Sequence, residues 1–129
     1  MKLVIPSAGT GSRLGDYTKN FNKGLVSVGT QPAIIRIIKD LSVKFDLEQV
    51  IILSGYQAEL LEEAISLLLE DINIKIIRVE NFSGPTSSLT HTLKHARDDL
   101  NTDFIFCAND TLCEFQARTN VLNDNWVAY

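Results

Sequence analysis

The stretch KLVIPSAGTGSRLG, residues 2–15, decides the fold because it joins an apolar strand directly to a glycine-rich loop. Residues 2–7 are mostly apolar and partly β-branched, which is typical of a short buried strand. Gly9, Gly11 and Gly15 follow at once. In open α/β sheets, ligands bind beyond the carboxyl ends of the strands. The stretch therefore predicts a buried strand that delivers a functional loop to the edge of a sheet.

Strands and helices are expected to alternate along the rest of the chain. Short apolar runs predict strands at residues 50–53, 74–79 and 104–107, and helical spacing of apolar residues predicts helices that begin at Pro32, near Ala58 and near Thr86. The last two helices are expected to end near Leu69 and Leu100. This order predicts an α/β fold, a Rossmann-like three-layer sandwich with a mostly parallel sheet and helices on both faces.

The helical spacing also predicts which side chains face the core. In the helix at 58–69 these are Leu60, Leu61, Ala64, Ile65 and Leu68, and in the helix at 86–100 they are Leu89, Leu93 and Ala96. Residues 8–25, in contrast, show little apolar periodicity and are rich in glycine and polar residues, so we expect a long loop there. Long ordered loops in compact domains are usually functional.

Composition limits the class of protein. The chain has 129 residues, of which 45% are hydrophobic, so we expect one globular domain. The net charge of −4 argues against nucleic-acid binding, but a nucleotide site needs only a few local cations and backbone amides. The sequence shows neither a signal peptide nor an apolar run long enough to span a membrane, which favours a cytoplasmic protein with no membrane partner. Whether it forms a homo-oligomer is left open.

The glycine loop has the composition of a phosphate-binding loop. Gly9 and Gly11 let backbone amides approach a phosphate, Arg13 offers a guanidinium that can grip two phosphate oxygens, and Lys23 adds a second cation. The spacing fits neither the dinucleotide-binding fingerprint nor the P-loop. From these residues alone, a flexible surface loop is an equally valid interpretation.

Four segments, taken in order, resemble one family. Residues 8–34, AGTGSRLGDYTKNFNKGLVSVGTQPAI, are similar to the opening motif of the sugar-phosphate nucleotidyltransferases. Residues 50–63 (VIILSGYQAELLEE), 81–89 (NFSGPTSSL) and 104–112 (FIFCANDTL) resemble the family's next segments in the same order. An ordered set of this kind is more specific than any single motif.

The resemblance implies a nucleotidyl transfer from a nucleoside triphosphate to a sugar phosphate or a similar phosphorylated alcohol, with release of pyrophosphate. It assigns catalytic roles to Arg13 and Lys23, and it assigns Mg²⁺ binding to Asp110. The nucleotide would be bound by Ala8, Gly9, Thr10, Gly11, Ser87 and Ser88. The implied partners are the triphosphate and the phosphorylated acceptor.

The sequence departs from the family pattern at several points. Asn22 stands where proline usually precedes the loop lysine, Asn109 stands where glycine usually precedes the metal-binding aspartate, and Thr30-Gln31-Pro32 replaces the usual Gly-Lys-Pro. Family members are longer, and their later half supplies a second metal-binding aspartate, a role that we do not assign to Asp124. We therefore expect residues 1–129 to be the N-terminal half of a larger nucleotidyltransferase domain, incomplete at the C-terminus. Two alternatives remain: a non-catalytic nucleotide or sugar-nucleotide binding module, and a structural α/β domain.

Overall fold

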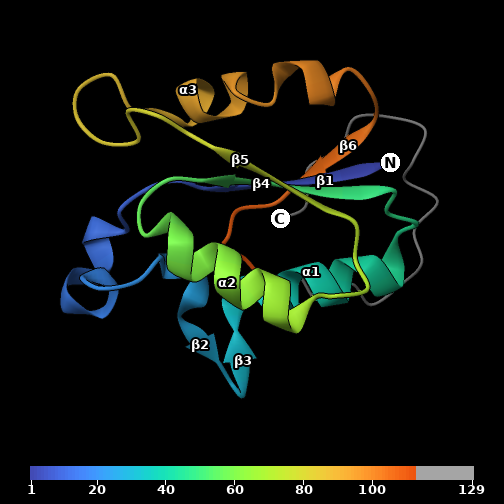
Figure 1. Cartoon of the computed structure of the whole chain (residues 1–129), viewed down its shortest axis with the longest axis horizontal. Coiled ribbons are helices and arrows are strands. Elements are labelled where there is room, and N and C mark those ends of the chain that lie inside the picture. Colours follow the sequence, from blue (N-terminus) through green and yellow to red (C-terminus); the bar gives the residue numbers. More distant parts are fainter. Residues whose placement is uncertain (113–129) are drawn as a thin grey trace.

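Four parallel strands form the central sheet of the computed structural model, which describes residues 1–112 (Figure 1). Their order across the sheet is β5-β4-β1-β6. The strands are β1 (Lys2–Ser7), β4 (Gln49–Ser54), β5 (Ile74–Arg78) and β6 (Phe104–Phe106), with a separate antiparallel hairpin of β2 (Ser27–Val28) and β3 (Gln31–Pro32). The helices are α1 (Ala33–Lys44), α2 (Ala58–Leu68) and α3 (Leu89–Lys94), and the 3₁₀ segments are η1 (Ser12–Thr18), η2 (Lys23–Leu25) and η3 (Arg97–Leu100).

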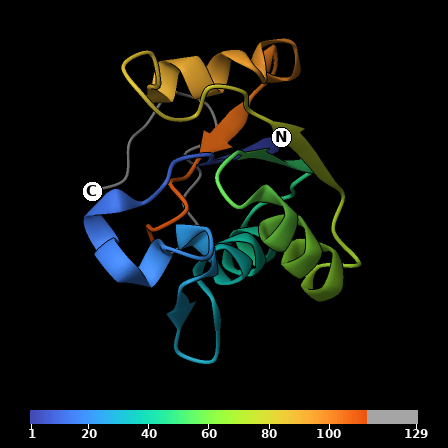
Figure 2. The same ribbon diagram turned by 60° about the vertical axis from the view of Figure 1, so that its left-hand side comes forward.

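Helices cover both faces of the sheet. Figures 1 and 2 show α1 and α2 on one face and α3 on the other. Side chains along β1 alternate between the two faces of the sheet and so belong to two parts of the core. Leu3 and Ile5 pack with α1 and α2, whereas Val4 packs with Ala96, which follows α3 in the chain. The expected α/β three-layer architecture with a parallel sheet is confirmed. Within residues 1–112, no helix has the length and apolar character needed to cross a membrane.

Two sequence expectations about the helices are wrong in detail. Leu60 and Leu68 were assigned to the inward face of α2, but their side chains are 44% and 46% exposed. The helix expected over residues 86–100 is shorter: Ser88 is extended and caps α3, so the helix begins one residue later, and Leu89 is 52% exposed. After α3 the hydrogen bonds shift to the tighter i to i−3 pattern, as in Ala96 N to Leu93 O at 3.0 Å.

The loop at residues 8–25 contains more regular structure than its sequence predicts. It folds into η1, broken at Gly15, and η2, and it leads into the β2–β3 hairpin. Gly11 and Gly15 both have positive φ, at 65° and 56°, a conformation that glycine adopts without steric cost. Thr18, which is buried, donates its hydroxyl to Gly11 O at 3.0 Å and so closes the turn.

A charged cluster joins α2 to β5, the outermost strand on one side of the sheet. Arg78 Nε donates to Glu62 Oε1 at 2.9 Å, and the hydroxyl of Ser54 donates to the same oxygen at 3.2 Å. The hydrogen bond from Arg78 is the main reason that the pKa of Glu62 lies below its ordinary value of 4.5. A carboxyl group whose pKa is lower in the folded chain stabilises the fold above its unfolded pKa, and that stabilisation is lost as the pH falls through the folded pKa.

We expect Glu62→Gln to lower the free energy of unfolding at pH 7 by about 0.5–1 kcal/mol, because it removes a charge-assisted hydrogen bond at a half-exposed site. The difference from the unsubstituted chain should shrink as the pH falls below 4.5, where Glu62 itself becomes protonated. Urea unfolding at a series of pH values measures both. Glu63→Gln, a change at an exposed position on the same helix, is the control. A difference that stays constant down to pH 3 would contradict this account.

Candidate functional site

Three chain segments leave the sheet at the same edge. Because β1 pairs in parallel with both β4 and β6, the carboxyl ends of all three strands lie together (Figure 1). The contacts continue past the strands: Tyr56 N donates to Ala8 O at 2.9 Å, and Cys107 N donates to Val4 O at 3.0 Å. The glycine loop therefore begins at the centre of the sheet edge, between the segments that follow β4 and β6.

The first residues of the glycine loop differ in how closely they are packed. Ala8 is buried, and its carbonyl oxygen lies against Gly55. A Cβ added at Gly55 would lie 2.8 Å from that oxygen. Gly9 is exposed, with open space where a Cβ would stand, whereas a Cβ on Gly11 would lie 3.1 Å from both Lys23 and Thr18. Gly9 therefore leaves the backbone accessible, and Gly11 is required by packing and by its φ.

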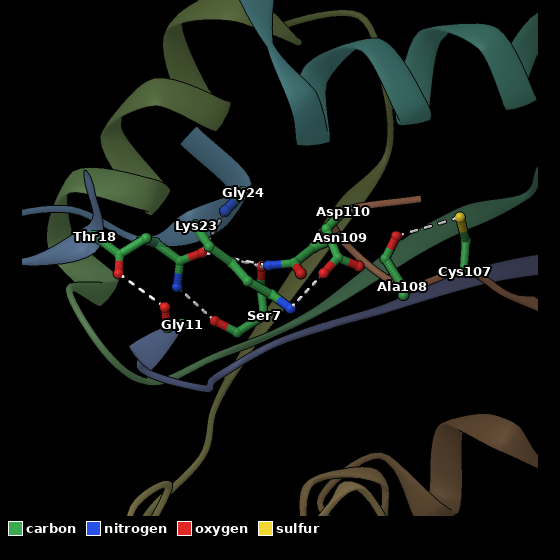
Figure 3. A network of polar contacts seen from close by, with 10 residues as sticks. Ser7, Gly11, Thr18, Lys23, Gly24, Cys107, Ala108, Asn109 and Asp110 are labelled. Atoms are coloured by element: carbon green, nitrogen blue, oxygen red, sulfur yellow. Dashed lines mark hydrogen bonds and ion pairs between the residues drawn. The ribbon is translucent and has the colours of Figure 1, made fainter. Parts of the chain in front are cut away.

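Lys23 and Asp110 meet at this edge. Their side chains point toward each other in Figure 3, and Lys23 Nζ lies 2.9 Å from Asp110 Oδ2. The lysine side chain is 25% exposed and the aspartate side chain is 54% exposed, so solvent reaches both. A cation from the glycine loop and a carboxylate from the segment after β6 are thus placed side by side, although 87 positions separate them in the sequence.

Arg13 lies in η1 and is exposed. Among the described residues its guanidinium makes no hydrogen bond or ion pair, so it is available to an anion. Thr10, between the two glycines, is half-buried. The structure therefore places Ala8, Gly9, Thr10 and Gly11 along one turn that runs from β1 toward Arg13.

Ser87 and Ser88 lie in the segment between β5 and α3. Figure 2 shows that this segment lies on the side of the sheet that α3 covers, whereas η1 lies on the other side. The hydroxyl of Ser87 donates to Gly84 O at 2.8 Å, and Ser88 Oγ accepts from His91 N at 3.0 Å as the N-cap of α3. In the structure both hydroxyls thus hold the local turn. No contact brings them to the glycine loop within residues 1–112.

A buried polar cluster lies next to the ion pair along the chain, and no local sequence pattern identifies it as part of the site. Asn22 is fully buried, Asn109 is 1% exposed, and both approach the buried Ser7 at the end of β1. Asn22 Oδ1 lies 3.4 Å from Asn109 Nδ2. The sequence hint that could have identified this cluster is that both asparagines depart from the family pattern, and each directly precedes a candidate site residue.

Asp110 is the one described acidic side chain in contact with Lys23 at this edge. Within residues 1–112, no group of three or more histidine, cysteine, aspartate or glutamate side chains could hold a metal by itself. Asp124 lies outside the described residues. Within residues 1–112, Asp110 is therefore the carboxylate at this edge that could contribute to a metal site, where water and a bound phosphate are further suitable ligands.

Comparisons with known proteins agree on one class. A family model described as "MobA-like NTP transferase domain" matches residues 3–114. Mannose-1-phosphate guanyltransferase of Schizosaccharomyces pombe is 29% identical over 119 residues, 89% of this chain and 32% of that protein. Choline-phosphate cytidylyltransferase of Streptococcus pneumoniae is 25% identical over 98% of this chain and 52% of its own length.

A solved structure of CTP:phosphocholine cytidylyltransferase from Streptococcus pneumoniae matches with a TM-score of 0.69 and 27% identity, over 84% of this chain and 44% of that one. The chain thus spans about a third to a half of the length of these relatives. The resemblance found in the sequence and the class of fold are confirmed by these matches.

We expect Gly11→Ala to lower the free energy of unfolding by about 1–3 kcal/mol, because alanine is strained at positive φ and its Cβ would crowd Lys23 and Thr18. Gly9→Ala is the matched control, since nothing lies within 4 Å of its added carbon. Urea unfolding of the two variants makes the comparison. Equal losses of stability would show that the turn does not depend on the conformation of Gly11.

Proposed function

Because the chain belongs to the MobA-like NTP transferase domain family, we propose that it binds a nucleoside triphosphate with Mg²⁺ for transfer of the nucleotidyl group to a phosphorylated acceptor. The observation that carries the proposal is the 2.9 Å contact between Lys23 and Asp110 beside the glycine loop. It joins a cation suited to phosphate with a carboxylate suited to a metal, at the strand ends where α/β sheets bind ligands.

The glycine loop supplies the phosphate contacts in this proposal. Backbone amides from Ala8 to Gly11 face the triphosphate, and the open space at Gly9 admits a phosphate oxygen close to the backbone. Arg13, which has no partner among the described residues, neutralises charge on the β- and γ-phosphates. Lys23 contacts the α-phosphate or the phosphate of the acceptor, for which it must turn from Asp110.

Asp110 fits a magnesium ion that is bound mainly through phosphate. Mg²⁺ in phosphoryl-transfer sites commonly takes one or two carboxylates, retains several waters and binds phosphate oxygens, so a single half-exposed carboxylate is a suitable donor. When bound, the ion would offset negative charge that develops on the phosphates. Asp110 would hold the ion in place of its present partner, the ammonium of Lys23.

The reaction needs little covalent chemistry from the protein. An oxygen of the acceptor's phosphate attacks the α-phosphorus and forms the new P–O bond. The bond from that phosphorus to the oxygen bridging to the β-phosphate breaks, and pyrophosphate carries the electron pair away. Positioning and charge neutralisation by Arg13 and Lys23 therefore account for catalysis in this proposal.

The acceptor belongs to the class of phosphorylated alcohols. The two relatives are named for mannose-1-phosphate and for choline phosphate, which share a phosphomonoester and differ in the alcohol. We propose a sugar phosphate as the first candidate, with phosphocholine as the alternative of the same class. Ser87 and Ser88 are proposed to lie near the base or the sugar, on the side of the sheet edge opposite η1.

We expect Arg13→Ala and Lys23→Ala each to weaken binding of the preferred triphosphate by about 10- to 100-fold, because each removes a charged hydrogen bond worth about 1.5–3 kcal/mol. Calorimetric titration of ATP, CTP, GTP and UTP in the presence of Mg²⁺ measures the affinities. Lys39→Ala removes an exposed lysine of α1 and gives the same change in net charge, so it is the control. Unchanged affinity in both loop variants would place the nucleotide elsewhere.

Pyrophosphate release distinguishes the enzyme from a binding module. The 129-residue chain is incubated with Mg²⁺, each triphosphate and each of mannose-1-phosphate, glucose-1-phosphate and phosphocholine. Release that requires one acceptor supports nucleotidyl transfer by this chain. Release by this chain would reject the non-catalytic binding module. Because residues 1–129 are expected to be the N-terminal half of a larger domain, nucleotide binding without release fits both an incomplete, inactive enzyme and a binding module, and absence of nucleotide binding would reject both.

A further inference from the structure

Asn22 has an amide orientation that its backbone neighbours determine. Asn22 Nδ2 donates to Ser7 O at 2.6 Å and to Tyr56 O at 3.0 Å, and both of these are carbonyl groups that can only accept. Asn22 Oδ1 accepts from Gly24 N at 2.9 Å. The oxygen therefore faces Gly24 and cannot exchange places with the nitrogen. One buried side chain thus ties the glycine loop to the ends of both β1 and β4.

The fixed oxygen of Asn22 orients the next two groups in turn. Ser7 Oγ lies 3.3 Å from Asn22 Oδ1 and must donate to it, which leaves the serine oxygen free to accept. Asn109 Nδ2 donates to Ser7 Oγ at 2.5 Å and also lies 3.4 Å from Asn22 Oδ1. The direction of each hydrogen bond is thus determined, from the backbone through Asn22 and Ser7 to Asn109.

This arrangement has a cost at Asn109. Its Oδ1 is buried and has no hydrogen-bond partner among the described residues. Burying an unpaired acceptor disfavours the fold, and an apolar side chain at the same position would avoid that penalty. A buried polar side chain with one oxygen unpaired among the described residues is a candidate for a role beyond packing.

The cluster is also joined to the ion pair through the backbone. Asn22 is the residue before Lys23, and Asn109 is the residue before Asp110. Figure 3 shows Asn109 beside Asp110. We propose that Asn22, Ser7 and Asn109 are positioning residues that set the separation of Lys23 from Asp110 for Mg²⁺ and triphosphate. This inference rests on the proposed function, because it concerns the same site. Substitution of side chains that orient metal ligands without binding the metal themselves commonly changes metal affinity by 10- to 100-fold.

The test is the Mg²⁺ concentration that half-saturates triphosphate binding, measured by calorimetry with ATP, CTP, GTP and UTP. We expect Asn109→Ala to raise this Mg²⁺ concentration about tenfold. The midpoint of thermal unfolding should change by less than about 5 °C, because the substitution removes the buried unpaired oxygen as well as the hydrogen bond to Ser7. Ser7→Ala should give the same increase, and the double variant should show no more than either single change, since both interrupt one path.

Asn73→Ala is the control for a change of asparagine away from the site, because the exposed Asn73 donates to Glu48 O at 3.0 Å at the amino ends of the strands. Circular dichroism at the titration temperature confirms that each variant is folded. Unchanged half-saturation in Asn109→Ala, or fully additive effects of Ser7→Ala and Asn109→Ala, would overturn this inference alone. Absence of triphosphate binding by the unsubstituted chain would overturn the proposed function and this inference with it.

Discussion

Pairing of β1 on both sides is the constraint from which the rest of the structure follows. As the strand with parallel partners in β4 and β6, it buries Leu3, Val4 and Ile5 completely. Parallel pairing also forces the three strands to end at the same edge. A loop that leaves β1 there has segments on either side within hydrogen-bonding distance. The position of the candidate site is therefore a consequence of sheet topology before any functional residue is considered.

Because of that topology, polar groups buried at the carboxyl ends of the strands have little access to water. Ser7, Asn22 and Asn109 are all nearly inaccessible to solvent, and an unpaired polar group there costs free energy. Their mutual hydrogen bonds remove most of that cost and at the same time restrict the segments that carry them. Because satisfied amides and hydroxyls have few alternative partners inside a protein, the cluster favours a single arrangement of the loop and of the segment after β6.

Much of this fold could be predicted from the sequence because the main signals are local. The apolar runs that became β1 and β4 carry a strand pattern within a few residues, and their alternation with helices predicts a parallel sheet. The wrong assignments also have local causes. Leu60 and Leu68 fit helical spacing, but spacing alone cannot tell how far the apolar face of α2 extends before it leaves the sheet. Capping by Ser88 overrode the periodicity that predicted an earlier start for α3.

The candidate site was predictable only in part. Glycines, an arginine and a lysine in one loop are compatible with phosphate binding and with a flexible surface loop, and the family resemblance favours the first and supplies Asp110. The contact between Asn22 and Asn109 spans 87 positions and depends on strand order, which no local pattern contains. Each asparagine was visible only as a departure from a familiar motif, and its meaning required the partner that lies beside it in space.

Anchoring by neutral side chains has an electrostatic consequence for a site of this kind. If Lys23 and Asp110 were held in place by buried charges, those charges would add to the field that a triphosphate and its metal experience, and would themselves need pairing. Amides and a hydroxyl carry no net charge, so in the proposed function the charges that the ligand meets come from Lys23, Asp110 and Arg13, which solvent also reaches. The position of the site and its charge are thus determined by different residues, and a substitution within the buried cluster can alter the geometry while the formal charge of the site stays the same.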